Sequence, residues 1–151
     1  MLAFPLTPYA DESLNGFLLR LSEENFLGSS STLLRAAGVR LKARYSETEL
    51  NAITETLGLE DSAIQQIGKF QRVSGSLTQG RFLRTAAVPV CIECLRASAY
   101  IRQAWHHQLF TACPEHQRSL LAVCPECSVP LDLKRHSITT CRCGYDLTTL
   151  N

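Results

Sequence analysis

Paired cysteines and histidines in the second half of the chain are the residues best suited to chemistry. All seven cysteines and all four histidines of the 151 residues lie between positions 91 and 143. Eight of them form four closely spaced pairs: Cys91/Cys94, Cys113/His116, Cys124/Cys127 and Cys141/Cys143. Two ligands on one tight turn can bind a single Zn²⁺ ion, and folding must then bring in a second pair to complete the tetrahedron.

Chain order assigns the four pairs to two zinc ions. We expect one ion to be bound by Cys91, Cys94, Cys113 and His116, and the other by Cys124, Cys127, Cys141 and Cys143. The odd number of cysteines argues against a framework fully paired in disulfides, and His116 supplies the eighth ligand. The chain is therefore expected to hold two structural Zn²⁺ ions in a reducing cytosol.

A catalytic zinc ion is not expected, because four protein ligands at each metal leave no coordination position for water. The deaminase pattern, His-x-Glu before Pro-Cys-x-x-Cys, is also missing, since no histidine precedes His106. The histidines outside the pairs, His106, His107 and His136, are expected to be exposed or to pack against neighbours. We predict no catalytic residues, no small-molecule substrate and no enzymatic activity; a zinc-activated water is the weakest alternative.

Residues between the ligand pairs predict how this half of the chain folds. Ile101, Trp105 and Leu109 are four residues apart, a spacing that predicts a helix placing Trp105 against the first metal site. The apolar run at 120–123 predicts a buried strand. We therefore expect a tandem zinc-ribbon or zinc-finger module over residues 89–151.

An extended arm and a first helix are predicted at the N-terminus. Pro5 and Pro8 keep the arm out of a helix, and its apolar side chains either pack back on the first helix or contact a partner. Residues 11–13 supply acidic charge and a capping side chain at the start of that helix. Its apolar residues recur at helical spacing: Leu14, Phe17, Leu18 and Leu21. Ser30 or Ser31 is expected to cap a short second helix.

Residues 47–68 have the pattern of a helix-turn-helix. A capping box at Ser46 and Glu49 begins one helix, and a Leu-Gly-Leu turn separates it from the next. The second helix of such a pair can read the DNA major groove, but here it begins with Glu60 and Asp61, which DNA phosphates repel. A protein-docking role is favoured, and a sequence-specific DNA-binding regulator that reads DNA with residues 47–68 is the alternative function.

The whole chain is expected to be a small α+β protein. Residues 1–72 form the helical, helix-turn-helix-like module with its extended arm, residues 73–88 a basic flexible linker, and residues 89–151 the tandem zinc module. Hydrophobic residues make up 45% of the chain, which is enough for a modest core. No apolar run approaches the length of a membrane span and no signal pattern opens the chain, so a membrane partner is not expected.

Basic residues are clustered although the chain is nearly neutral. Seven thiolates (−7) and two Zn²⁺ ions (+4) would change the formal charge from +1 to −2, so only local patches can bind nucleic acid. Positions 35–44 and 62–92 contain no acidic residue. The candidate nucleic-acid contacts in them are Arg35, Arg40, Lys42, Arg44, Lys69, Arg72, Arg81 and Arg84. A solvated linker is an equally good reading of the second segment.

Two parts of the sequence resemble the TniQ family, the target-selector adaptors of transposons, which includes TnsD and the TniQ of CRISPR-associated transposons. Residues 8–14 (Pro-Tyr-Ala-Asp-Glu-Ser-Leu) and 19–22 (Leu-Arg-Leu-Ser) are similar to the opening motif of the family. The zinc half follows the family order: Cys91-x-x-Cys94, Trp105, Cys113-Pro-Glu-His116, Leu120-Leu121, Cys124-Pro-x-Cys127 and Pro130-Leu131. The ordered combination covers nearly the whole chain.

The resemblance implies a non-enzymatic adaptor in DNA transposition in the bacterial cytoplasm. One side engages a target-recognising component on target DNA, either an RNA-guided Cas effector with its guide RNA or a DNA-binding extension of the protein itself. The other side recruits TnsC, the AAA+ ATPase that licenses the transposase, and we expect the helical module and its arm to bind this ATPase. The sequence ends eight residues after Cys143, as in the short type found with single-protein Cas12-like effectors, or in a truncated form.

Overall fold

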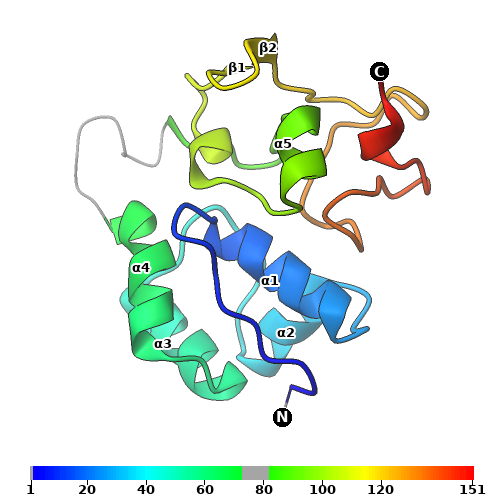
Figure 1. Cartoon of the computed structure of the whole chain (residues 1–151). Coiled ribbons are helices and arrows are strands. Elements are labelled where there is room, and N and C mark those ends of the chain that lie inside the picture. Colours follow the sequence, from blue (N-terminus) through cyan, green and yellow to red (C-terminus); the bar gives the residue numbers. More distant parts are fainter. Residues whose placement is uncertain (1, 73–81) are drawn as a thin grey trace.

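Helix α1 (Leu14–Glu24) lies at the centre of the computed structural model, between a helical half and a half that carries the cysteines (Figure 1). The structure describes residues 2–72 and 82–151. Eight of the eleven residues of α1 are buried, so the helix is covered on nearly every side. Within the described residues, no helix is both long and apolar enough to cross a membrane.

The helical half consists of α1, α2 (Ser30–Ala36), α3 (Glu47–Leu57) and α4 (Asp61–Arg72). The predicted capping box of α3 is confirmed: the Ser46 hydroxyl accepts from the Glu49 N–H at 3.2 Å, and the Glu49 carboxylate accepts from the Ser46 N–H at 2.8 Å. Helix α2 is capped by Ser29, one residue before the earlier of the two predicted positions. Apolar faces of all four helices form one core: Leu14, Phe17, Leu18, Leu21, Leu33, Leu34, Leu50, Ile53, Ile64 and Ile67.

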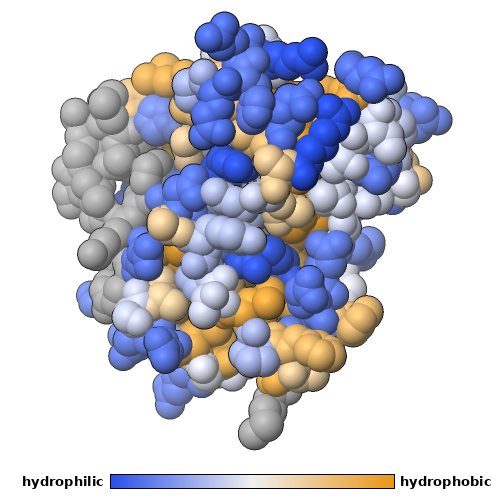
Figure 2. Space-filling model, in the orientation of Figure 1, coloured by the Kyte–Doolittle hydropathy of each residue, from blue (hydrophilic) through white to orange (hydrophobic). Residues whose placement is uncertain are grey.

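The N-terminal arm packs back on the helical half, as one of the two expectations had it. Leu2 packs against the helical core. The Asn25 side chain, at the end of α1, accepts from the Phe4 N–H and donates to the Phe4 carbonyl, each at 2.9 Å. Arg20 donates to the Thr7 carbonyl at 2.9 Å. Around the arm, apolar side chains remain visible on the surface of the helical half (Figure 2).

The start of α1 differs from the prediction. Ser13 caps the helix, since its hydroxyl accepts from the Gly16 N–H at 3.0 Å, but no acidic residue lies in the first turn. Glu12 is instead fully buried and accepts two hydrogen bonds from Arg20, at 2.7 and 2.9 Å. Asp11 and Glu12 therefore lie just before the cap, and the charge of Glu12 is paired with Arg20, which the sequence pattern did not predict.

The cysteine-bearing half is built from short elements. They are α5 (Ile92–Ala97), the 3₁₀ turns η2 (Gln103–His106) and η3 (Leu147–Thr149), and the antiparallel strands β1 (Ala112–Cys113) and β2 (Arg118–Ser119). In the register, Ala112 pairs with Ser119 and Cys113 with Arg118. A core of fifteen buried residues, centred on Trp105, holds these elements together. The small α+β fold class is confirmed.

Two local predictions for this half were wrong. The helix expected over 101–109 is only the turn η2, because the backbone of Ile101 and Gln103 pairs with the segment before α1. Leu109 is 66% exposed. The strand expected to be buried at 120–123 forms only isolated bridges, and Val123 is 42% exposed.

The two halves meet along a seam, which we define as the contact of residues 9–23 with residues 100–103 and Ile138. The Ser13 N–H donates to the Ile101 carbonyl at 2.9 Å, and the Gln103 N–H donates to the Asp11 carbonyl at 2.8 Å. The Tyr9 ring stacks on the Tyr100 ring with centroids 4.1 Å apart, and the Tyr100 hydroxyl donates to Asp11 at 2.7 Å. Leu19, from α1, is part of the core of the cysteine-bearing half.

Part of the predicted linker is packed on the fold. Leu83 and Val88 are buried, and the Arg84 N–H donates to the His106 carbonyl at 2.7 Å. The rest of the linker, residues 73–81, lies outside the described residues. The division into modules with boundaries at 72 and 89 stays a prediction.

Candidate functional site

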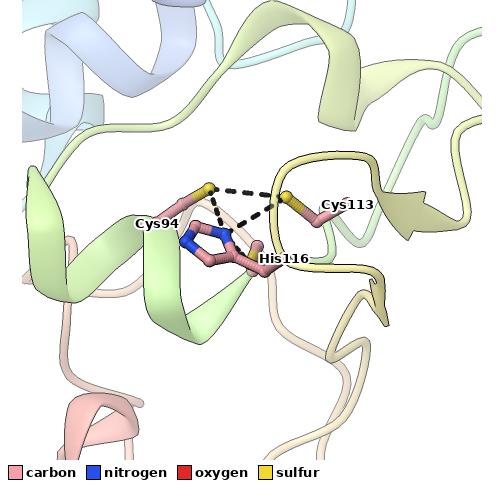
Figure 3. A group of neighbouring side chains, drawn as sticks. Cys94, Cys113 and His116 are labelled. Carbon is pink, nitrogen blue, oxygen red and sulfur yellow. Dashed lines mark hydrogen bonds between the residues drawn. The ribbon is translucent and has the colours of Figure 1, made fainter.

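The first set of predicted ligands converges from three elements. Cys91 precedes α5 and Cys94 lies in its first turn, while Cys113 ends β1 and His116 lies in the β1–β2 turn. The His116 Nδ1 atom lies 3.4 Å from the sulfurs of Cys91, Cys94 and Cys113 (Figure 3). The Cys94 and Cys113 sulfurs are 3.6 Å apart. All three cysteines are buried and His116 is half-buried.

These separations are those of four ligands around one ion. A tetrahedron with Zn–S bonds of ~2.3 Å and a Zn–N bond of ~2.0 Å has S–S edges of roughly 3.8 Å and N–S edges of roughly 3.5 Å. The four ligand atoms lie within 4.8 Å of one another, and their edges match these values closely. Three sulfurs and one nitrogen fit a closed, four-coordinate metal site.

The second set converges at the other end of this half. The Cys124 and Cys143 sulfurs are 3.8 Å apart, and the Cys127 and Cys141 sulfurs 3.7 Å. Gly144, at φ 92°, lets the chain turn back after Cys143, and its N–H donates to the Cys141 carbonyl at 2.9 Å. Cys143 is exposed and Cys127 half-buried, so this set is more open to solvent than the first.

A comparison with protein families identifies a family for this chain. The family model described as TniQ matches residues 3–120, well over half of the chain. The chain belongs to the TniQ family. TniQ proteins are non-catalytic adaptors associated with transposition. No curated protein matches the chain.

The TniQ match divides the metal sites. It includes the whole first set, from Cys91 to His116, and ends before the first ligand of the second set, Cys124. The seam residues before and within α1 also lie inside it. The first candidate metal site and the seam, apart from Ile138, thus belong to the part of the chain that the TniQ model matches.

The predicted nucleic-acid contacts in residues 35–44 lie on the helical half of this TniQ chain. Arg35, Arg40 and Arg44 are exposed, and the first two line one shallow depression. Lys42 instead forms an ion pair with Glu49 at 2.6 Å. Three exposed guanidinium groups, with no ion pair to the described residues, and one paired ammonium therefore make up the basic surface of this segment.

The contacts predicted after residue 62 are less accessible where the structure describes them. Arg84 is half-buried, and its guanidinium donates to the carbonyls of Trp105, Gln108 and Phe110 at 3.2–3.4 Å. The Arg81 residue and the side chains of Lys69 and Arg72 lie outside the described part of the chain. Arg84 thus fixes the backbone after η2, a role that its place in a basic segment did not predict.

His106 is the histidine with the most unusual surroundings. It is 8% exposed, and its Nε2 atom has no hydrogen-bond partner among the described residues. Burial, with a smaller contribution from the charge of Arg84, lowers the pKa of His106 to about 4. The ring borders a cavity of about 400 Å³ between the halves, which Lys42 also lines. His106 therefore packs as a neutral ring, as predicted for a histidine outside the ligand pairs.

Arg135 and Tyr45 are buried polar residues that sequence reasoning missed. Arg135 is 1% exposed and donates to the carbonyls of Asp132, Ser137 and Ile138, which closes the loop before the last ligand pair. Burial lowers the pKa of Arg135 to about 10, so the guanidinium stays charged at neutral pH. The Tyr45 hydroxyl donates to Asn15 at 2.7 Å, and burial raises its pKa to about 12. These partners are distant in sequence or belong to the backbone, so no spacing pattern could reveal them.

Proposed function

We propose that the chain is a non-enzymatic adaptor that links a target-recognition complex to the AAA+ ATPase TnsC and so directs target-site selection in transposition. Family membership carries the proposal, since TniQ proteins are transposition adaptors. The target-recognition complex we favour is an RNA-guided Cas effector with its guide RNA on target DNA, in the bacterial cytoplasm.

Both metal sites are proposed to hold structural Zn²⁺. Thiolate and imidazole ligands with tetrahedral edges suit Zn²⁺, and four protein ligands at each ion leave no position for a reacting water. When bound, each ion supplies folding free energy to a half whose regular elements are short. Zinc then keeps residues 100–103 in place against α1, so the ions support a binding surface rather than a reaction.

The exposed arginines of residues 35–44 are proposed to contact the phosphate backbone of target DNA or guide RNA. Their exposed guanidinium groups and the lack of acidic residues in the segment support this role. Replacing Arg35, Arg40 and Arg44 with glutamate should weaken association with nucleic acid and flatten its dependence on salt. A matched Arg118→Glu variant, at a 63% exposed side chain of the other half, should keep the wild-type salt slope. An unchanged slope in the triple variant would contradict these contacts.

A pull-down of the purified chain tests the adaptor itself. The chain is expected to retain TnsC and the Cas effector complex when each is offered alone, and to bring the two together when both are present. Retention of neither component would refute the adaptor proposal. If the chain retained each component alone but did not bring the two together, it would be a binding partner of both and not an adaptor between them.

A DNA-binding regulator that reads DNA with α3 and α4 is the rival function. The turn at Gly58, with φ 62°, gives these helices a helix-turn-helix-like arrangement. Glu60 and Asp61 are exposed at the start of α4, where they repel phosphates. A gel-shift assay at physiological salt separates the two functions, because tight, sequence-dependent binding by the isolated chain would favour the regulator.

A further inference from the structure

Helices α1, α2 and α3 end with the same backbone motif. In each, a residue in the left-handed region donates its N–H to the carbonyl three positions earlier, and the next N–H donates to the carbonyl five positions earlier. The left-handed residues are Phe26, Gly38 and Gly58, with φ of 55°, 70° and 62°. Glycine is the usual residue there because it has no Cβ to clash. The fold thus uses glycine at two of these three positions and phenylalanine at the third.

Phe26 gains nothing from the fold that would offset this strained backbone. Its side chain is 87% exposed, the highest value among the exposed large hydrophobic residues that the structure describes. The left-handed backbone of a non-glycine residue costs folding free energy, and the exposed ring recovers almost none of it by burial; uncompensated strain of this kind is typical of functional sites. The ring of Phe26 is therefore better explained by a contact outside the chain than by packing within it.

A groove on the helical half is lined by the two sequence neighbours of Phe26, Asn25 and Leu27. Its volume is about 400 Å³, within the range of ligand pockets, and its lining is mostly apolar. The lining includes Leu2, Asn25, Leu27, Leu33, Ala36 and Leu57. Phe4, which is 52% exposed and hydrogen-bonded to Asn25, adds a second aromatic ring at this place. The apolar surface between the arm and the end of α1 is visible in Figure 2.

The electrostatics of the groove favour a cation. The C-terminal ends of three helices line it, through Asn25 of α1, Ala36 of α2 and Leu57 of α3. A helix C-terminus carries partial negative charge, and neither α1 nor α3 has a basic residue in its last turn to neutralise it. Glu24 and Glu55, both exposed, add two full negative charges next to lining residues. Arg35, in the last turn of α2, adds one positive charge, so the balance stays negative. This surface repels nucleic acid and attracts basic groups.

We propose that Phe26 and this groove bind a segment of a protein partner that presents apolar side chains flanked by lysine or arginine. The apolar side chains fill the groove, and the basic groups face the helix ends and stack on the exposed ring. The inference rests on the proposed adaptor function only in requiring a protein partner. The chemistry of that segment follows from the groove itself.

Substitution of Phe26 separates a docking role from a structural one. Phe26→Gly places at the end of α1 the residue that ends α2 and α3, and Phe26→Asn offers a second side chain tolerated in the left-handed region. Both variants should be at least as stable as wild type in thermal unfolding. Ala36→Trp fills the groove from its exposed rim. Leu109→Asn, which removes a 66% exposed apolar side chain from the other half, is the matched control.

The probes are a fluorescein-labelled amphipathic peptide of leucine and lysine and its leucine–glutamate counterpart, with binding followed by fluorescence polarisation. Wild type and Leu109→Asn should bind the lysine peptide at least tenfold more tightly than the glutamate peptide. Phe26→Gly, Phe26→Asn and Ala36→Trp should weaken lysine-peptide binding at least tenfold.

Three results would overturn the inference: unchanged peptide binding by the Phe26 variants, equal binding of the two peptides, or self-association of wild type that the Phe26 variants lose. The last result would make the partner a second copy of this chain. Because the peptides replace the transposition proteins, a failed pull-down with TnsC and the effector would refute the adaptor proposal and leave this result standing.

Discussion

Replacing Gly16 with alanine tests whether the two halves are held together along α1. A Cβ at Gly16 would lie 2.5 Å from Ile101 Cβ and 2.8 Å from Ser13 Oγ. Both Gly16 and Ile101 are buried, so one of the two backbones must move by about 1 Å to restore contact distances, as in other overpacked sites. The hydrogen bond from Ser13 N–H to the Ile101 carbonyl crosses this same point and would lengthen.

Two opposing effects decide the sign of the change. Alanine favours the helix over glycine by about 1 kcal/mol. Overpacking costs about 1–3 kcal/mol, and the weakened hydrogen bond adds about 1 kcal/mol. We expect Gly16→Ala to lower the free energy of unfolding by about 2 kcal/mol net. For a chain of this length, the melting temperature then falls by about 4–8 °C.

Gly68→Ala in α4 is the matched control. Within the described part of the chain, a Cβ there meets only Leu50 Cδ1 at 3.7 Å, an ordinary van der Waals distance, so the helix preference decides the effect. This variant should be more stable than wild type by about 0.5–1 kcal/mol. Hydrogen exchange gives a second measurement, since the Ser13 and Gln103 amides should exchange faster in Gly16→Ala alone. A Gly16→Ala protein as stable as Gly68→Ala would refute the packing we describe at the seam.

Three further substitutions test the metal sites and the buried charges. Cys113→Ser should lower bound zinc from two ions to one per chain by elemental analysis, and retention of two would contradict the ligand set. Glu12→Gln leaves the Arg20 guanidinium, 14% exposed, without its carboxylate, and should cost about 3 kcal/mol in urea unfolding; a change under ~1 kcal/mol would be contrary. Burial lowers the pKa of His106 from 6.5 to about 4. As the pH falls from 6.5 toward 4, the unfolded chain therefore binds a proton at this residue that the folded chain does not, and the free energy of unfolding decreases. Between pH 7 and pH 5 wild type should therefore lose about 2 kcal/mol more than His106→Gln, and equal losses would be inconsistent with a neutral buried ring.

Local signals predicted the elements whose causes are local. The capping box of Ser46 and Glu49 involves neighbours in sequence, and it formed as predicted. The metal ligands were recognisable for a similar reason, because each pair lies on one turn. The four pairs contain eight ligands, which is the number that two four-coordinate sites need. Their convergence into two sets of four required no knowledge of the rest of the fold.

Long-range contacts decided what the sequence could not predict. The spacing of Ile101, Trp105 and Leu109 suits a helix, but the Ile101 carbonyl accepts a hydrogen bond from the N–H of Ser13, which lies 88 positions earlier in the chain. Glu12 looked like a helix-dipole residue and became a buried partner of Arg20. In both cases the competing interaction comes from the seam or the arm, and neither leaves a periodic pattern in the sequence.

The position of α1 gives the adaptor a physical link between its two halves. At the start of the helix, Ser13 and Gly16 contact Ile101, in the half that carries the metal ligands. Near its end, Glu23 accepts a hydrogen bond from the Ile138 N–H at 3.0 Å, three residues before Cys141. Phe26 follows directly after this end. Because both candidate metal sites lie close in sequence to residues that contact α1, we expect loss of either proposed ion to loosen the contact at one end of the helix. Of these two contacts, the one at Ile138 is nearer in sequence to Phe26 through Glu23, so we expect removal of metal from the more exposed second site to have the greater effect on binding at the proposed docking groove.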